Sequence, residues 1–160
     1  NWLSKYVNAN KDDTKNQFIL GLAYQKDYQY RKSLEHLHLA LGQMYDKDLI
    51  AKIYEEQGNT YVKYGDYLNF RDSLKNNVNE MYKLAKENYL TALELVPDNY
   101  NMYKILGEFY EHHNKNIQLA IYYYDKFYEN IDPNKTREHE LIWIKDKITR
   151  LKEEAHFIGE

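Results

Sequence analysis

His112 and Glu108 come closest to a pattern that could do chemistry in this sequence. They stand four residues apart, and a helix brings residues at that spacing to one face, as metal-ligand pairs require. Two ligands are too few to hold an ion specifically. The sequence therefore predicts no metal site.

Other reactive patterns are missing as well. His36 and His38 are two residues apart and point to different faces of a helix. The sequence contains no Ser-His-Asp elbow, no glycine-rich phosphate loop and no HExxH motif. With Cys 0, thiol catalysis and thiolate metal sites are also excluded. We expect a protein that is not an enzyme and uses no cofactor.

The composition favours long helices. A chain of 160 residues suits one domain, and only Gly 6 and Pro 2 are available to break helices. A net charge of -3 disfavours nucleic acid as a partner. No apolar run is long enough to span a bilayer, so we expect membrane contact only through segments absent from this chain.

Apolar residues recur at helical spacing through most of the chain, as Leu34, Leu37 and Leu41 illustrate. Strict alternation never lasts long enough to predict a strand. The sequence predicts an all-α fold of about seven helices, near residues 14–28, 31–45, 48–64, 72–95, 99–113, 116–130 and 135–156.

Three glycines share a local pattern, because a tyrosine follows each of them by three residues. A glycine inside a helix costs about 1 kcal/mol against alanine, so close approach of a second helix is the expected reason. The pairs are Gly21 and Tyr24, Gly58 and Tyr61, and Gly107 and Tyr110.

Small residues recur seven positions apart in the helix that follows, which lets a neighbouring helix nestle in. A proline that can end the helix comes soon afterwards in two cases. These positions are Ser33 and Ala40, then Ala85, Ala92 and Pro97, and finally Ala120 and Pro133, with the bulky Phe127 as the second member of the third pair.

Together these spacings resemble the tetratricopeptide repeat (TPR), a unit of about 34 residues with two antiparallel helices. The resemblance implies a solenoid of helical hairpins wound as a right-handed superhelix. We expect one domain over residues 14–160, and Asp12 or Asp13 to cap its first helix. Its parts are repeats near 14–47, 48–98 and 99–133 and a capping helix near 135–156, preceded by the end of an earlier helix or a linker over residues 1–13.

The resemblance also implies a concave groove, lined by the first helix of each pair, that binds a partner protein. The carboxylate clamp of the chaperone-adaptor branch is broken, because Phe18, Leu22, Glu56, Asn101 and Ile105 occupy its positions. The remaining groove mixes apolar and charged residues. By register it contains Phe18, Leu22, Lys52, Asn59, Val62, Lys63, Asn101, Lys104 and Glu108, with Gln25, Glu55 and Glu111 beside them.

The second unit carries fifteen extra residues, which we expect to lengthen its second helix into an arm. Unsheltered apolar residues on this arm would mark a partner site. They are Tyr67, Leu68, Phe70 and Leu74. The alternative is a loop that folds back and covers its own residues.

The sequence therefore favours a non-catalytic scaffold that binds another protein through the groove, the arm or both. A bacterial cell-envelope complex is favoured over the cytoplasm. Abundant Asn, Lys and Tyr indicate an AT-rich genome, such as that of a spirochaete. The alternatives are a homo-oligomerisation module with a tyrosine-rich face and, less favoured, an RNA-binding helical repeat.

Overall fold

The structure, a computed structural model, describes residues 13–42, 44–71, 77–134 and 136–158. Every regular element in these ranges is helical, so the all-α prediction is confirmed. The seven α-helices are α2 (Thr14–Lys26), α3 (Tyr30–Leu41), α4 (Lys47–Phe70), α5 (Val78–Leu95), α6 (Tyr100–Phe109), α7 (Ile117–Asn130) and α8 (Glu138–Ile158). A short π-helical turn, η2 (Tyr110–Asn114), continues α6.

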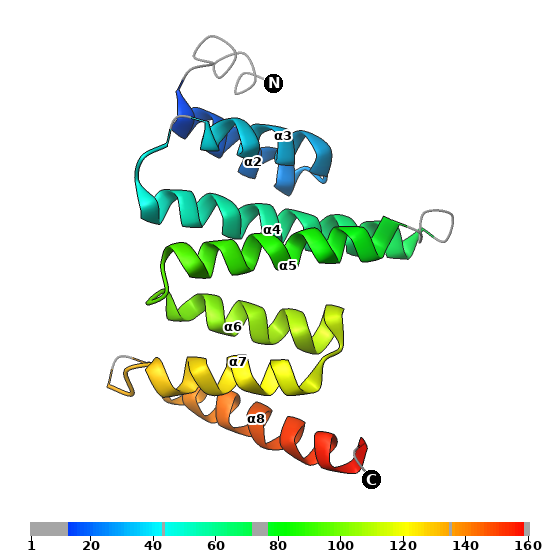
Figure 1. Cartoon of the computed structure of the whole chain (residues 1–160), viewed down its shortest axis with the longest axis vertical. Coiled ribbons are helices and arrows are strands. Elements are labelled where there is room, and N and C mark those ends of the chain that lie inside the picture. Colours follow the sequence, from blue (N-terminus) through cyan, green and yellow to red (C-terminus); the bar gives the residue numbers. More distant parts are fainter. Residues whose placement is uncertain (1–12, 43, 72–76, 135, 159–160) are drawn as a thin grey trace. The chain divides into compact units, whose positions relative to one another are not determined.

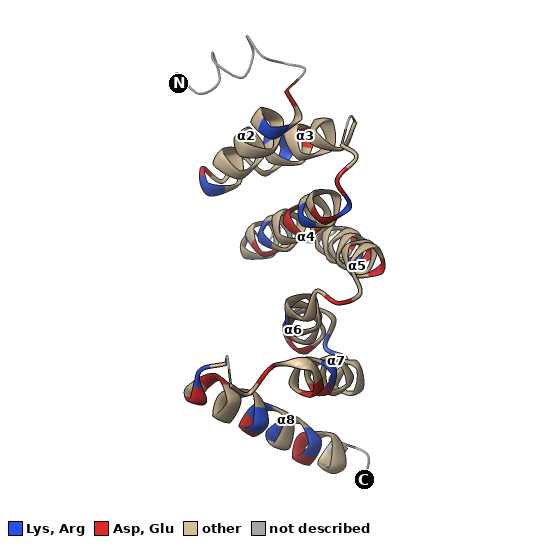
Figure 2. Ribbon diagram, turned by 90° about the vertical axis from the view of Figure 1, so that its left-hand side faces the viewer, with Lys and Arg blue, Asp and Glu red and all other residues tan. Residues whose placement is uncertain are grey.

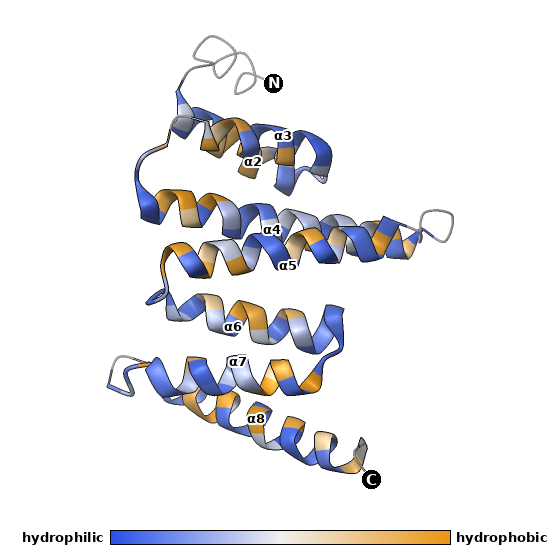
Figure 3. Cartoon of the chain, in the orientation of Figure 1, coloured by the Kyte–Doolittle hydropathy of each residue, from blue (hydrophilic) through white to orange (hydrophobic). Residues whose placement is uncertain are grey.

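The helices pack as consecutive hairpins (Figure 1). The chain forms two compact units that divide after Val96. In the first unit α2 pairs with α3, α4 pairs with α5, and α3 also contacts α4. In the second unit α6 pairs with α7, and α7 contacts α8. Hydrophobic and hydrophilic residues alternate along the helices (Figure 3), so each has an apolar stripe to bury. This arrangement is that of a helical repeat.

Side-chain caps fix where several helices begin. Asp13 accepts hydrogen bonds from the backbone amides of Lys15 and Asn16 at the start of α2, which confirms one of the two predicted caps. Asp46 caps α4 in the same way, and Asn116 accepts from the amide of Leu119 in α7. Each cap satisfies amide groups that the helix itself leaves unpaired.

The three predicted contact glycines lie where paired helices approach most closely. A Cβ added at Gly21 would lie 2.7 Å from Leu37, and one added at Gly107 would lie 2.6 Å from the Tyr124 ring. A Cβ added at Gly58 would likewise collide with the Tyr89 ring. Any side chain at these positions would collide with the partner helix, so the predicted reason for the glycines is confirmed.

The small residues of the second helices are buried as predicted. Their exposed fractions do not exceed 1% at Ser33, Ala40, Ala85, Ala92 and Ala120. Five tyrosines on the helices are also covered: Tyr89, Tyr110 and Tyr124 are buried, and Tyr24 and Tyr61 are half-buried. Tyrosine thus supplies much of the material between the paired helices.

The prediction that the insertion lengthens only the second helix is wrong. Helix α4 continues to Phe70, beyond its expected end near residue 64, and α5 begins at Val78. We call Gly65–Phe70 of α4 and Val78–Tyr82 of α5 the arm. The arm repeats the contact that Gly58 makes with Tyr89. Gly65 follows Gly58 by seven residues, and a Cβ at Gly65 would lie 2.6 Å from the ring of Tyr82.

This pairing decides which apolar residues of the arm are covered. Leu68, which was expected to be unsheltered, is only 4% exposed, and Val78 is 7% exposed. Two helices running side by side shield each other, whereas one extended helix could not. Phe70 is 92% exposed and Tyr67 is 39% exposed, as predicted. Leu74 and residues 1–12 lie outside the described ranges.

The turn between α2 and α3 comes earlier than predicted. Helix α2 ends at Lys26, and Tyr28 adopts a left-handed conformation with φ 58°. The amide of Gln29 donates to the Tyr24 carbonyl at 3.0 Å, and the amide of Tyr28 donates to the Gln25 carbonyl at 3.2 Å. These bonds define a Schellman motif, in which glycine usually takes the left-handed position.

Helix α8 buries one face and exposes the other. Ile144 and Leu151 are at most 1% exposed. On the opposite face Lys145, Lys152 and Glu153 are exposed. Among the described helices, none has the length and apolar character to cross a membrane.

Candidate partner-binding site

The polar residues predicted for the groove in the first unit bond to one another. Gln25 of α2 donates to Thr60 at 2.8 Å and accepts from the Lys63 ammonium at 2.6 Å. Asn59 accepts from the Tyr89 hydroxyl at 2.9 Å. These bonds join α2 to α4 and α4 to α5, so the structure brings the residues together as parts of the helix packing.

The rest of the groove in this unit is also engaged. Lys52 bonds to Glu55 at 2.6 Å and to Glu56 at 3.0 Å. Burial alone would lower the pKa of Lys52, but these two carboxylates outweigh it and raise the pKa. Phe18 packs against the core cluster around Leu37. Leu22 and Val62 are half-buried.

In the second unit, α8 lies against the predicted groove residues. Lys104 bonds to Glu140 of α8 at 3.0 Å, and its ammonium lies 5.1 Å from the centre of the Trp143 ring. Glu108 is half-buried, and Asn101 is exposed. Since α8 supplies these partners, the charge of Lys104 is already paired within its own unit.

Glu111 is the centre of the contacts between α8 and this unit. It bonds to Lys147 at 3.0 Å and to Arg150 at 2.8 Å, and it accepts from the Tyr124 hydroxyl at 2.9 Å. Burial alone would raise the pKa of Glu111, but the bonds from Lys147 and Tyr124 outweigh it and lower the pKa. A cavity of about 250 Å³ lies beside Trp143 in this region. Lys147 and Arg150 line that cavity, but both are already paired with Glu111. The cavity is therefore a weak candidate for a binding site.

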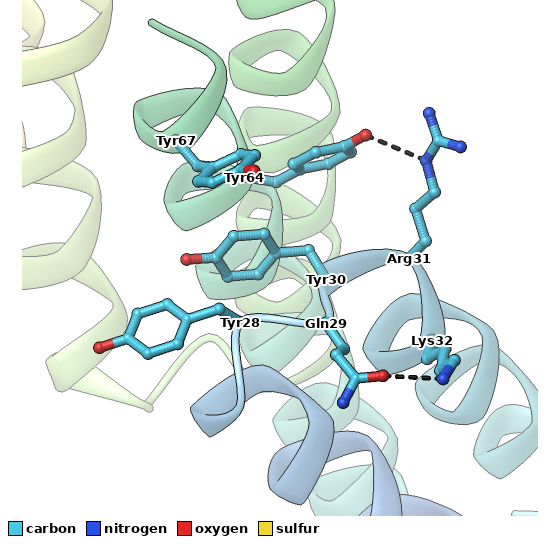
Figure 4. A pocket seen from close by; sticks show the side chains of 7 residues that line it. All are labelled: Tyr28, Gln29, Tyr30, Arg31, Lys32, Tyr64 and Tyr67. Carbon is cyan, nitrogen blue, oxygen red and sulfur yellow. Dashed lines mark hydrogen bonds between the residues drawn. The ribbon is translucent and has the colours of Figure 1, made fainter. Parts of the chain in front are cut away.

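An open cavity of about 300 Å³ in the first unit has a different character (Figure 4). It lies where the α2–α3 turn and the start of α3 meet the end of α4. We call it the aromatic pocket. Four of its seven lining residues are tyrosines, and the full set is Tyr28, Gln29, Tyr30, Arg31, Lys32, Tyr64 and Tyr67.

The tyrosine rings contact one another around Tyr30. The ring centre of Tyr30 lies 6.4 Å from that of Tyr28, 5.6 Å from that of Tyr64 and 6.0 Å from that of Tyr67. Tyr30 is only 7% exposed, so it forms the floor. Tyr28 is 76% exposed and Tyr67 is 39% exposed, so they form the walls. Burial, helped by Tyr28 and Asp66, raises the pKa of Tyr30, and its hydroxyl therefore remains a hydrogen-bond donor.

Basic side chains stand at the edge of the aromatic pocket. Arg31 donates through Nε to the Tyr64 hydroxyl at 3.0 Å, and Figure 4 shows its two terminal nitrogens directed away from the rings. Lys32 donates to the Gln29 side chain at 2.7 Å. The guanidinium of Arg71 lies 5.0 Å from the centre of the Tyr67 ring. All three basic residues are exposed.

The carboxylates near the pocket are already bonded. Asp27 accepts from the Gln29 side chain. Asp66 accepts from the Tyr82 hydroxyl at 2.7 Å. Their partners are neutral, so both carboxylates keep their charge, but neither lines the pocket. The lining residues include two basic side chains, Arg31 and Lys32, and no acidic one.

Of this site, the sequence predicted Tyr67 but not Tyr28, Tyr30, Arg31 or Tyr64. The signal that could have found them is the tyrosine at position 28. A bulky residue directly after a helix, where a left-handed turn favours glycine, indicates that its side chain has a use.

Within the described ranges, no group of three or more His, Asp or Glu side chains could hold a metal ion. The fold and the aromatic pocket together define an all-α helical-repeat protein with an open cavity, among its described residues, that is lined by aromatic and basic side chains.

No protein-family model matches the chain, but comparison with known proteins gives a distant relative. Over 113 residues the chain is 34% identical to the Sol locus transcriptional repressor of Clostridium acetobutylicum. The match covers 71% of this chain and 27% of the relative. The chain thus spans about a quarter of that protein's length.

Proposed function

We propose that this protein is a non-catalytic interaction module of the TPR type that binds a partner protein at the aromatic pocket. The observation that carries the proposal is the exposure of aromatic residues from the α2–α3 turn and the arm around one cavity. Aromatic and arginine side chains dominate the energetics of protein interfaces. The pocket offers both.

Support for the TPR type comes from the repeated hairpin contacts. Each contact glycine faces one residue of the paired helix. The two are sixteen positions apart for Gly21 and Leu37 and seventeen apart for Gly107 and Tyr124. Gly58 and Tyr89 are thirty-one apart, which is sixteen after the fifteen inserted residues are removed. One hairpin geometry is therefore used three times.

The relative's name suggests a setting for such a module. If this chain takes part in repression, it would act through a protein rather than through DNA. Its net charge is -3, and basic and acidic residues are interspersed along the described helices (Figure 2), whereas DNA phosphates require clustered positive charge.

A photo-crosslinking experiment tests the proposal. p-Benzoylphenylalanine is placed at Phe70, beside Tyr67 on the arm, and in a second variant at Tyr45. These positions are matched, because Phe70 is 92% and Tyr45 is 95% exposed and neither lines the pocket. They differ in place: Phe70 is three residues from the pocket residue Tyr67, whereas Tyr45 precedes the start of α4. We expect a discrete crosslinked partner from position 70 in cells that express the protein, and none from position 45.

The crosslink must also depend on the pocket itself. Adding Tyr67→Ala to the position-70 variant is expected to reduce the crosslinked product at least about tenfold, as for the loss of an interface anchor. Equal products from positions 70 and 45, or a product insensitive to Tyr67→Ala, would refute the pocket as the site.

Homo-oligomerisation is the second candidate. Helix α7 of the second unit exposes Leu119 (36%), Tyr122 (52%) and Tyr128 (42%), and apolar and aromatic side chains of this kind can form a contact between copies. Sedimentation equilibrium at rising concentration tests it. A monomeric mass throughout would exclude this function.

A further inference from the structure

We infer that the occupant of the aromatic pocket is an extended protein segment that carries proline next to acidic residues. This inference rests on the proposed function and names the class of partner. Three features of the pocket lead to it: its exposed tyrosines, the charge at its edge and the conformation of Tyr28.

The walls of the pocket favour proline. The rings of Tyr28 and Tyr67 meet Tyr30 at 86° and 60°, so they form an open, angled surface rather than a slot between parallel rings. Polyproline II segments dock on aromatic-lined surfaces of this kind, because they are extended before binding and lose little entropy. Their carbonyl groups have no internal partners and can accept from tyrosine hydroxyls.

The edge of the pocket favours carboxylates. Figure 4 shows the rings of Tyr28 and Tyr30 on one side and Arg31 and Lys32 on the other. An apolar ring seated on the tyrosines would place its flanking residues near these cations. The terminal nitrogens of a guanidinium bind carboxylate in a bidentate manner, so acidic neighbours complement the site.

The conformation of Tyr28 indicates that its ring is kept for contact. A left-handed residue other than glycine costs about 1–2 kcal/mol, and Tyr28 has φ 58° with its ring 76% exposed. Burial of the ring therefore does not offset the strain. The Schellman turn would form more easily with glycine, yet the chain places an aromatic wall of the pocket there.

Binding of synthetic peptides to the purified chain tests the inference by fluorescence anisotropy. The probe is a short labelled peptide of alternating glutamate and proline. Matched peptides replace glutamate with glutamine or lysine, or proline with alanine or phenylalanine. We expect the glutamate–proline probe to bind most tightly, with about a tenfold loss for each replacement of its charge or its proline.

Protein variants assign the binding to the pocket. Arg31→Gln is expected to weaken the glutamate–proline probe about tenfold, because a charge-assisted pair is lost, and to leave the glutamine–proline peptide unchanged. Tyr28→Gly removes one wall while relieving the turn, so it is expected to lose binding in a chain that is still folded. Tyr45→Ala is the matched control and should bind as the original chain does.

Three results would overturn the inference: no binding of the glutamate–proline probe, equal binding of its alanine form, or tighter binding of its phenylalanine form. Each can be separated from failure of the proposed function. A pocket-dependent crosslink at position 70 to a partner without such a segment would leave the proposed function standing and the proline assignment wrong.

Discussion

Between the paired helices tyrosine rings lie over glycines, whereas at the aromatic pocket tyrosine rings remain open to solvent. Tyr124 is 0% exposed and Tyr89 is 3% exposed, each against a contact glycine. Tyr28 and Tyr67 line a cavity and are 76% and 39% exposed. The same residue type therefore serves packing in one region and an accessible surface in the other. Stability and binding should respond to substitution in opposite ways in the two regions.

The largest loss of stability is expected from Tyr124→Ala. The ring is fully buried and its hydroxyl bonds to Glu111, so removing it should cost about 3–5 kcal/mol of the free energy of unfolding. Urea denaturation followed by circular dichroism measures this cost. Tyr128→Ala, at a position 42% exposed in the same helix, is the control and should cost less than about 1 kcal/mol. Similar costs for the two would show that burial does not distinguish the packing tyrosines from exposed ones.

Gly58→Ala is expected to cost about 1–3 kcal/mol, because the new Cβ would collide with the Tyr89 ring. Helix propensity alone predicts the opposite, a gain of about 1 kcal/mol. Gly42→Ala is the matched control: its nearest atom would lie at 3.4 Å, and we expect no loss. Thermal unfolding of the two variants decides the matter. A stabilised Gly58→Ala protein would show that the helices do not meet closely there.

Acid should weaken the contacts of the buried tyrosine in the second unit. The pKa of Glu111 is lowered in the folded state, so the unfolded chain binds more protons as the pH falls. The stabilisation from Glu111 is therefore complete above its unfolded pKa of about 4.3 and is lost as the pH falls through the folded pKa. Unfolding measured from neutral to acidic pH should show a shallower acid dependence for Glu111→Gln than for the original chain. Equal dependences would show that Lys147 and Arg150 do not favour the charged form.

The smallest effect on stability is expected at the pocket. Tyr28→Gly should leave the free energy of unfolding unchanged or raise it by up to about 1 kcal/mol, because glycine accepts the left-handed turn without strain. Lys115→Gly is the matched control, since Lys115 has φ 56° at the turn after η2 and no role in the pocket. The difference between the two changes in the free energy of unfolding measures how much stability the Tyr28 ring contributes through its contact with Tyr30. A loss above about 2 kcal/mol for Tyr28→Gly would place Tyr28 with the packing tyrosines.

The insertion shows how the two regions are connected. The pair Gly65 and Tyr82 extends the packing contacts of Gly58 and Tyr89 outward. That extension places Tyr67 against Tyr30 at the start of α3, where it completes the pocket, and leaves Phe70 exposed. The sequence indicated an arm with partner-binding residues but assigned it to one helix. The sequence predicts a helix near residues 72–95 but does not predict that α4 continues past residue 64.

The sequence by itself determined the helices and their contact points. Helical periodicity, the capping Asp13 and the costly glycines at positions 21, 58 and 107 are local signals, because residues three or four apart share a helix face whatever the rest of the chain does. A glycine in such a position can be read as a close approach before the partner is known. The fold class and the repeated hairpin follow from these signals.

Only the tertiary structure decided which side chains meet. Tyr30 and Tyr67 are thirty-seven residues apart, and their contact depends on how α3 packs on α4 and on where α4 ends. The same packing engaged most of the predicted groove residues of the first unit, such as Lys63 with Gln25, and left Tyr28 at the mouth of a cavity. The physical reason is that a sequence pattern fixes the face of a helix on which a residue lies. What that face touches depends on the paired helices and the turns that join them.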